Sequence, residues 1–106
     1  MVSQEQVISL IREYVFDEEL PRYTFANAKS QVFRKKSYLL WAADELMCLL
    51  LKRRTESPIR VIEDFKNKTL LFSKIGSINA KSAFAIAYDL AVNILDVCQA
   101  AGWTKN

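Results

Sequence analysis

Apolar residues recur at helical spacing along almost the whole chain, and they fall into four segments. The first segment begins at Ser3 and ends near Asp17, with apolar residues at intervals of three and four that predict one buried face. Ser3 and Gln6 have the spacing of a capping box, in which each side chain bonds a backbone amide of the other residue. Pro21 follows and blocks any continuation. The sequence therefore predicts a first helix over residues 3–17.

The second segment starts at Thr24, a suitable N-cap, and continues to the basic run at residues 52–54 without Gly or Pro. Lys35 interrupts its apolar stripe. Two interpretations stay open: one long helix, or a break between Arg34 and Ser37 with Ser37 capping a new helix. The back of this segment carries a mixed aromatic and polar face, which we expect to pack on another helix or a partner chain. Its members are Tyr38, Trp41, Glu45, Cys48 and Lys52.

Two further helices are predicted in the second half of the chain. Ser57 and Pro58 give the third helix an N-cap and a proline in its first turn, and Gly76 is expected to end it in the left-handed conformation. Asn79 is the predicted N-cap of the fourth helix, which extends to Gly102. We expect Trp103 to fold back on the bundle.

The fourth helix is nearly apolar all round over residues 82–101, so it requires cover on several sides. We therefore predict an all-α fold, a single domain over residues 1–106. It is a four- or five-helix bundle of mostly antiparallel neighbours, with loops of three to seven residues and the C-terminal helix at its centre. Hydrophobic residues make up 51% of the 106 residues, with two Gly and two Pro, which also favours a helical globular domain.

Charge adds one alternative function. The net charge of +3 is small, but the basic residues cluster early in the second segment. The cluster is Lys29, Arg34, Lys35 and Lys36, with aromatic residues close by. Clustered cations bind phosphates and aromatic rings stack on bases, so this segment predicts a nucleic-acid-binding accessory protein as one alternative.

The residue types exclude most catalytic chemistry. The chain has no histidine and only two cysteines, Cys48 and Cys98, each within an apolar stretch where a thiol acts as a small hydrophobe. Asp89, Asn93 and Asp96 lie on one side of the fourth helix. Such carboxylates could hold magnesium for a hydrolase only if further acidic residues faced them. We expect no catalytic site, metal or cofactor, and take the acidic strip as a solvated edge.

The first residues lack the pattern of a signal peptide, and no apolar segment is expected to span a bilayer, which favours a cytoplasmic protein. Five segments of the chain share one resemblance: YTFANAK from Tyr23, WAADEL from Trp41, SPI from Ser57, AYD from Ala87 and ILD from Ile94. With these segments the chain resembles a group of short all-helical bacterial proteins of unknown function that are often carried on mobile elements or phages. The resemblance implies a bacterial cytoplasmic setting and no particular chemistry.

The apolar surplus of the last helix and the aromatic back face of the second predict a non-enzymatic protein that acts through protein contacts. We expect a homodimer or a complex with a protein partner, with Tyr38, Trp41 and Trp103 at the interface. The alternative is that the first helix and Trp103 cover this apolar surface within one chain.

Overall fold

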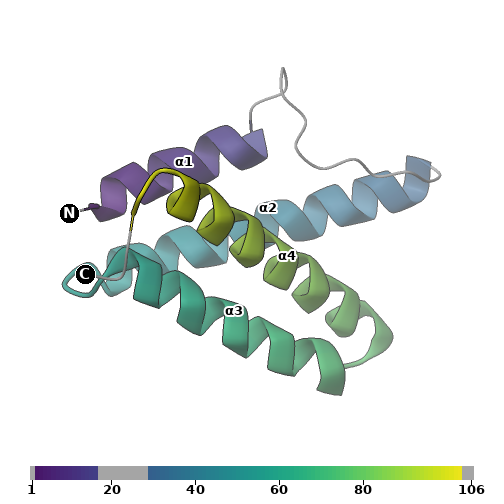
Figure 1. The fold of residues 1–106 in the computed structure, drawn as a ribbon. Coiled ribbons are helices and arrows are strands. Elements are labelled where there is room, and N and C mark those ends of the chain that lie inside the picture. Colours follow the sequence, from purple (N-terminus) through teal and green to yellow (C-terminus); the bar gives the residue numbers. More distant parts are fainter. Residues whose placement is uncertain (1, 17–28, 104–106) are drawn as a thin grey trace.

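This computed structural model describes residues 2–16 and 29–103, and most of these residues belong to four helices. Side chains are described for all of these residues except 29–35. The helices are α1 (Gln4–Phe16), α2 (Lys29–Lys52), α3 (Pro58–Ile75) and α4 (Ile78–Ala100). Figure 1 shows that helices consecutive in sequence run in opposite directions. The predicted all-α fold is confirmed, with four helices in the described ranges.

Helix α1 begins with the predicted capping box. The Ser3 N–H donates to Gln6 Oε1 at 2.7 Å, and the Gln6 N–H donates to Ser3 Oγ at 3.2 Å. The Gln4 side chain also donates to the backbone oxygen of Glu56 at 2.9 Å, which joins the start of α1 to the loop between α2 and α3. The two reciprocal bonds between Ser3 and Gln6 satisfy backbone amides that would otherwise lack a partner at the start of the helix.

Helix α2 is continuous through Arg34 and Ser37, so the single-helix interpretation is confirmed over Lys29–Lys52. The predicted cap at Thr24 lies outside the described residues. Figure 1 shows the first turns of α2 reaching past the end of α1.

Arg53 holds the connection between α2 and α3. Its Nε and Nη2 atoms donate to the two carboxylate oxygens of Glu56 at 2.7 Å each, and Nη2 also donates to Asp64 at 2.7 Å. These bonds raise the pKa of the arginine and lower the pKa of Glu56. Pro58 opens α3 as predicted, although the Ser57 side chain makes no capping bond.

The junction of α3 and α4 corrects two predictions. Gly76 is extended, with φ −87°, and is not left-handed. Ser77, not Asn79, caps α4, and its hydroxyl accepts from the Ala80 N–H at 3.3 Å. The loop between the two helices has only two residues, and a β-carbon at position 76 would lie 2.8 Å from Ala80 Cβ. Glycine therefore serves close helix approach here.

The end of α4 is a Schellman motif. The Trp103 N–H donates to the Cys98 oxygen at 2.9 Å, the Gly102 N–H donates to the Gln99 oxygen at 3.0 Å, and Gly102 has φ +79°. This geometry satisfies the last carbonyls and requires a residue without a β-carbon at position 102. It turns Trp103 back onto the core, as predicted, where the ring is half-buried.

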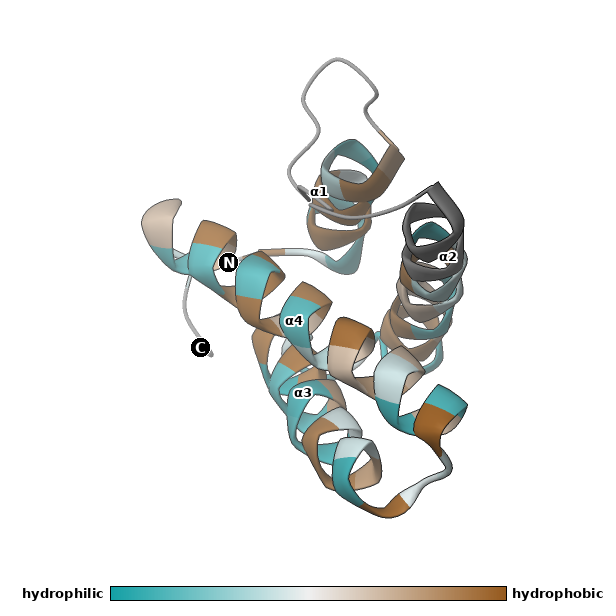
Figure 2. Ribbon diagram, turned by 90° about the vertical axis from the view of Figure 1, so that its right-hand side faces the viewer, coloured by the Kyte–Doolittle hydropathy of each residue, from teal (hydrophilic) through white to brown (hydrophobic). Residues whose placement is uncertain are grey.

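The core lies where α4 crosses the other helices. Helix α4 contacts all three, most extensively α3, and α2 also contacts the other three. Figure 2 shows α4 between α1 and α3, with many brown hydrophobic residues along its length. The fully buried α4 side chains are Ala87, Leu90, Ala91, Ile94 and Cys98. By length and composition alone α4 could cross a membrane, so the expectation that no segment is apolar enough was wrong.

Candidate functional site

An apolar groove opens between α2 and α3, with α4 contributing to its lining. It encloses a cavity of about 210 Å³. We call it the aromatic groove, and its lining residues are Trp41, Glu45, Cys48, Leu49, Lys52, Phe65, Lys68, Thr69 and Phe84. The back face predicted for the second helix therefore supplies one wall, since residues 41, 45, 48 and 52 follow each other at intervals of three and four.

Three aromatic rings from three helices meet beside the groove. The Trp41 and Phe84 rings are 5.5 Å apart and nearly perpendicular at 82°, and Phe84 and Phe72 are 5.1 Å apart at 33°. Edge-to-face contact of this kind is favourable beyond the area it buries. Trp41 nevertheless remains 38% exposed. The chain itself thus covers this ring only in part.

The rim of the groove carries charges of both signs. Glu45 and Lys52 are exposed on α2, and exposed Lys68 on α3 lies with Nζ 6.0 Å from the centre of the Phe72 ring. Within the described part of the chain, neither Glu45 nor Lys52 forms an ion pair. Tyr38, the other aromatic residue predicted for this face, is half-buried. The rim therefore offers charges that are available to another molecule.

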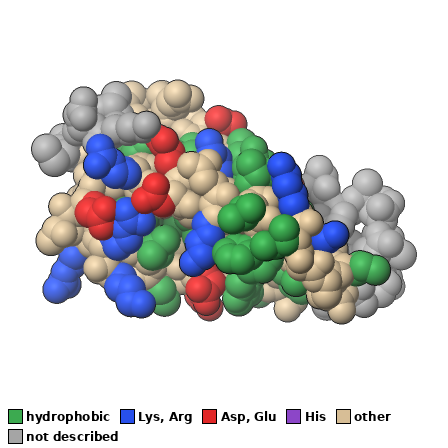
Figure 3. All heavy atoms as spheres, turned by 90° about the horizontal axis from the view of Figure 1, so that it is seen from below, with side chains coloured by type: hydrophobic (Ala, Val, Ile, Leu, Met, Phe, Trp, Pro, Cys, Tyr) green, Lys and Arg blue, Asp and Glu red, His purple; other side chains and the backbone are tan. Residues whose placement is uncertain are grey.

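A second apolar surface lies where α3 turns into α4. We call it the hairpin tip, and it consists of Leu71, Ile75 and Ile78, which are 57%, 65% and 84% exposed. The charged residues nearest to it in sequence are Lys68, Lys74 and Lys81, all exposed. Figure 3 views the molecule from below and shows hydrophobic side chains grouped on that face, with Lys and Arg side chains around them.

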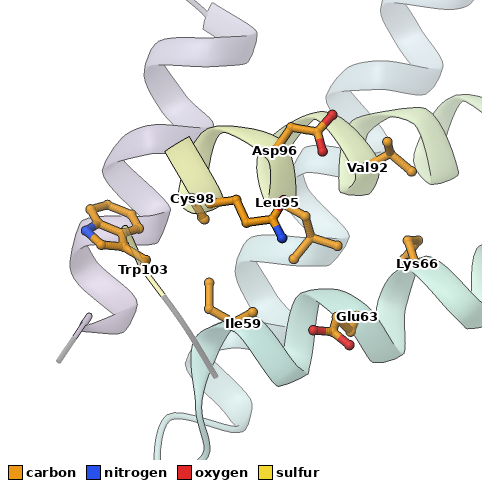
Figure 4. Close-up of a pocket in the computed structure, with 9 residues that line it drawn as sticks. Ile59, Glu63, Lys66, Val92, Leu95, Asp96, Cys98 and Trp103 are labelled. Carbon is orange, nitrogen blue, oxygen red and sulfur yellow. The ribbon is translucent and has the colours of Figure 1, made fainter. Parts of the chain in front are cut away.

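A larger open cavity of about 440 Å³ lies between α3 and the C-terminal half of α4 (Figure 4). Its lining mixes apolar and charged residues: Ile59, Glu63, Lys66, Val92, Leu95, Asp96, Cys98, Gln99 and Trp103. The Asp96 carboxylate points away from Glu63 in this view. The two carboxylates therefore do not converge on one point.

The acidic strip of α4 does not assemble a metal centre. Asn93 uses its side-chain amide to donate to the backbone oxygen of Asp89 at 2.7 Å. The Asp89 side chain is exposed, and partial desolvation by its surroundings raises the pKa of its carboxyl group. Among the described residues, no three His, Cys, Asp or Glu side chains lie close enough to hold a metal ion. Within residues 2–16 and 29–103, Asp89 and Asp96 thus lack the facing carboxylates that a magnesium site requires.

The basic cluster proposed for nucleic acid lies in the first turns of α2, at Lys29, Arg34, Lys35 and Lys36. Lys36 is exposed, while the side chains of the other three lie outside the description. The nucleic-acid hypothesis therefore stays a prediction.

The two cysteines differ in environment. Cys98 is buried, as predicted, and burial raises the pKa of its thiol to about 11. Cys48, which was predicted on the mixed back face of the second helix, is exposed in the aromatic groove. One thiol of the protein is thus accessible and the other is inert at neutral pH.

Sequence reasoning identified the α2 wall of the groove but missed Phe84, Lys68 and the hairpin tip. Periodicity shows which residues share a helix face, but it does not show which faces of separate helices meet. Comparison with known proteins adds no relative, since no family model, no curated protein and no solved structure matches this chain.

Proposed function

We propose that this protein is a non-enzymatic helical protein that acts through protein contacts and associates with itself. The observation that carries the proposal is the exposure of large apolar side chains on well-formed helices, at Trp41 in the aromatic groove and at the three hairpin-tip residues. Exposed apolar surface of this kind, rimmed by polar residues, marks interaction sites on soluble proteins.

The hairpin tip gives the scale of the effect. The exposed fractions of Leu71, Ile75 and Ile78 together amount to about two fully exposed aliphatic side chains. Burying one such side chain gains ~1.5–3 kcal/mol, so covering the tip would gain roughly 3–6 kcal/mol before the cost of association. This gain supports binding of a partner, and the aromatic groove supplies further surface.

Two separate apolar surfaces suit a protein that holds two neighbours. We propose that one surface joins two copies of the chain and that the other binds a different protein. At the hairpin tip, a two-fold contact would bring Lys74 and Lys81 of both copies together, and like charges oppose such pairing. The tip is therefore better suited to an acidic partner than to self-association.

Sedimentation velocity over a range of about 1–100 µM tests self-association, since these concentrations correspond to association free energies of roughly −8 to −5.5 kcal/mol. We expect a concentration-dependent shift from the 12.2 kDa chain to a particle of twice that mass. A chain that sediments as a 12.2 kDa monomer throughout this range would contradict the proposal.

A further inference from the structure

We propose that two copies meet across the aromatic groove, with a two-fold axis near Cys48, so that Glu45 of each copy pairs with the partner subunit's Lys52. The inference rests on the self-association proposed above and assigns its location. It starts from the α2 wall of the groove, where Trp41, Glu45, Cys48 and Lys52 are all exposed along one side of the helix.

The order of charges on this wall is self-complementary. Glu45 and Lys52 are seven residues apart, about two turns or ~10.5 Å along the helix axis, and Cys48 lies close to the midpoint. A two-fold axis at that midpoint makes the two α2 helices antiparallel. Each Glu45 then faces a Lys52 of the other copy, twice per dimer, because a two-fold contact repeats every pair.

Other registers lose this match. Parallel α2 helices in the same register would bring Glu45 against the partner subunit's Glu45 and Lys52 against the partner subunit's Lys52. Like charges across an interface disfavour a wrong arrangement, and opposite charges fix the register. Neither residue has an ion-pair partner within the described chain, so both remain available for this contact.

Apolar cover favours the same surface. The exposed part of Trp41 and the open lining of the groove lie on the same wall as these charges. Aromatic side chains are enriched at interface cores, where they bury a large area in fixed geometry. In this register Trp41 lies just beyond the end of the partner α2, opposite the partner's loop between α2 and α3, and that loop would cover the exposed part of the ring.

Charge reversal tests the register. The variants are Glu45→Lys, Lys52→Glu and the double variant, with Glu13→Lys as a matched control because Glu13 is exposed on α1, which does not line the groove. Each single variant places like charges at two sites of the dimer and should raise its dissociation constant at least about tenfold at low salt. The double variant restores both pairs and should return to within about threefold of the native value.

Sedimentation equilibrium gives these constants, and circular dichroism confirms that each variant is folded. A native protein that stays monomeric would remove the proposed self-association and this inference with it. A dimer that tolerates both single reversals, or that the double variant fails to restore, would overturn the assigned interface and leave self-association standing.

Cys48 supplies an independent test. The proposed axis brings the two Cys48 thiols together, so oxidised glutathione should join them in a disulfide. The two thiols lose two protons and two electrons, and the oxidant becomes two molecules of reduced glutathione. We expect rapid covalent dimers from the native protein and none from Cys48→Ser, since Cys98 is buried. Cross-linking no faster than in Glu45→Lys at the same concentration would overturn the assignment.

Discussion

The role of α4 as a core helix can be tested by changing isoleucine to alanine at one fully buried position and at one highly exposed position of the helix. Ile94 is 0% exposed and Ile78 is 84% exposed, and both belong to α4. Changing either residue to alanine removes the same atoms and replaces isoleucine with a better helix former. Ile78 is the first residue of α4 and Ile94 lies in its interior, so the gain in helix propensity favours Ile94→Ala, and a larger loss of stability in that variant reports packing.

The expected magnitude follows from burial. Ile94→Ala removes three buried carbons, worth ~0.8 kcal/mol each, so the transfer loss is about 2.4 kcal/mol. Incomplete collapse around the site adds a cavity term, which brings the expected loss of unfolding free energy to roughly 3–4 kcal/mol. Ile78→Ala should change the unfolding free energy by less than about 0.5 kcal/mol.

Urea denaturation followed by circular dichroism measures both losses. With an m-value of about 1.5 kcal/mol/M, Ile94→Ala should lower the midpoint by about 2 M, and Ile78→Ala should leave it almost unchanged. The measurement belongs at low micromolar concentration, where self-association contributes least. Equal midpoints for the two variants, or a larger loss for Ile78→Ala, would refute the arrangement of α4 described above.

Three further predictions follow from local geometry. Gly102→Ala should lower stability by about 1 kcal/mol in thermal melts, because φ is +79° while no atom lies within 4 Å of an added β-carbon; an unchanged melting temperature would count against the left-handed cap. At pH 8, and at a concentration low enough to keep the chain monomeric, a chromogenic disulfide reagent should detect one thiol per native chain, Cys48, and two after denaturation, because burial raises the pKa of Cys98 to about 11; two fast thiols in the native protein would disagree. Arg53 lowers the pKa of Glu56, so their pairing stabilises the fold at pH values above the usual pKa of a glutamate. This stabilisation is lost as the pH falls through the lowered pKa. The urea midpoint of the native protein should therefore exceed that of Arg53→Gln by less in acid than at neutral pH. A difference in midpoint that grows in acid would contradict the pairing.

Helix positions could be predicted from sequence because their signals are local. The reciprocal bonds of Ser3 and Gln6 and the proline at position 58 involve residues within one turn of each other. The prediction of the N-cap of α4 was wrong because local signals did not distinguish Ser77 from Asn79, which are both good N-cap residues and lie two positions apart. The choice between them depends on how closely α3 and α4 approach, which is a tertiary property.

The candidate site was predictable only in part. The spacing of Trp41, Glu45 and Lys52 placed them on one face of α2, and the structure opens that face to the groove. The contact of Trp41 with Phe84 joins residues far apart in sequence, and no periodicity within one helix indicates such a pair. Cys48 shows the same limit, because a thiol in an apolar stretch can lie on either side of an amphipathic helix.

The contact of α4 with all three other helices has a consequence for how the protein is made. A ribosome synthesises α4 after the other three, so the emerging chain carries its apolar faces uncovered until Ile94 and its neighbours leave the exit tunnel. Early termination within α4 would yield chains with no completed interior, prone to aggregation and degradation. Chains truncated within α4 should therefore give little folded protein when they are expressed.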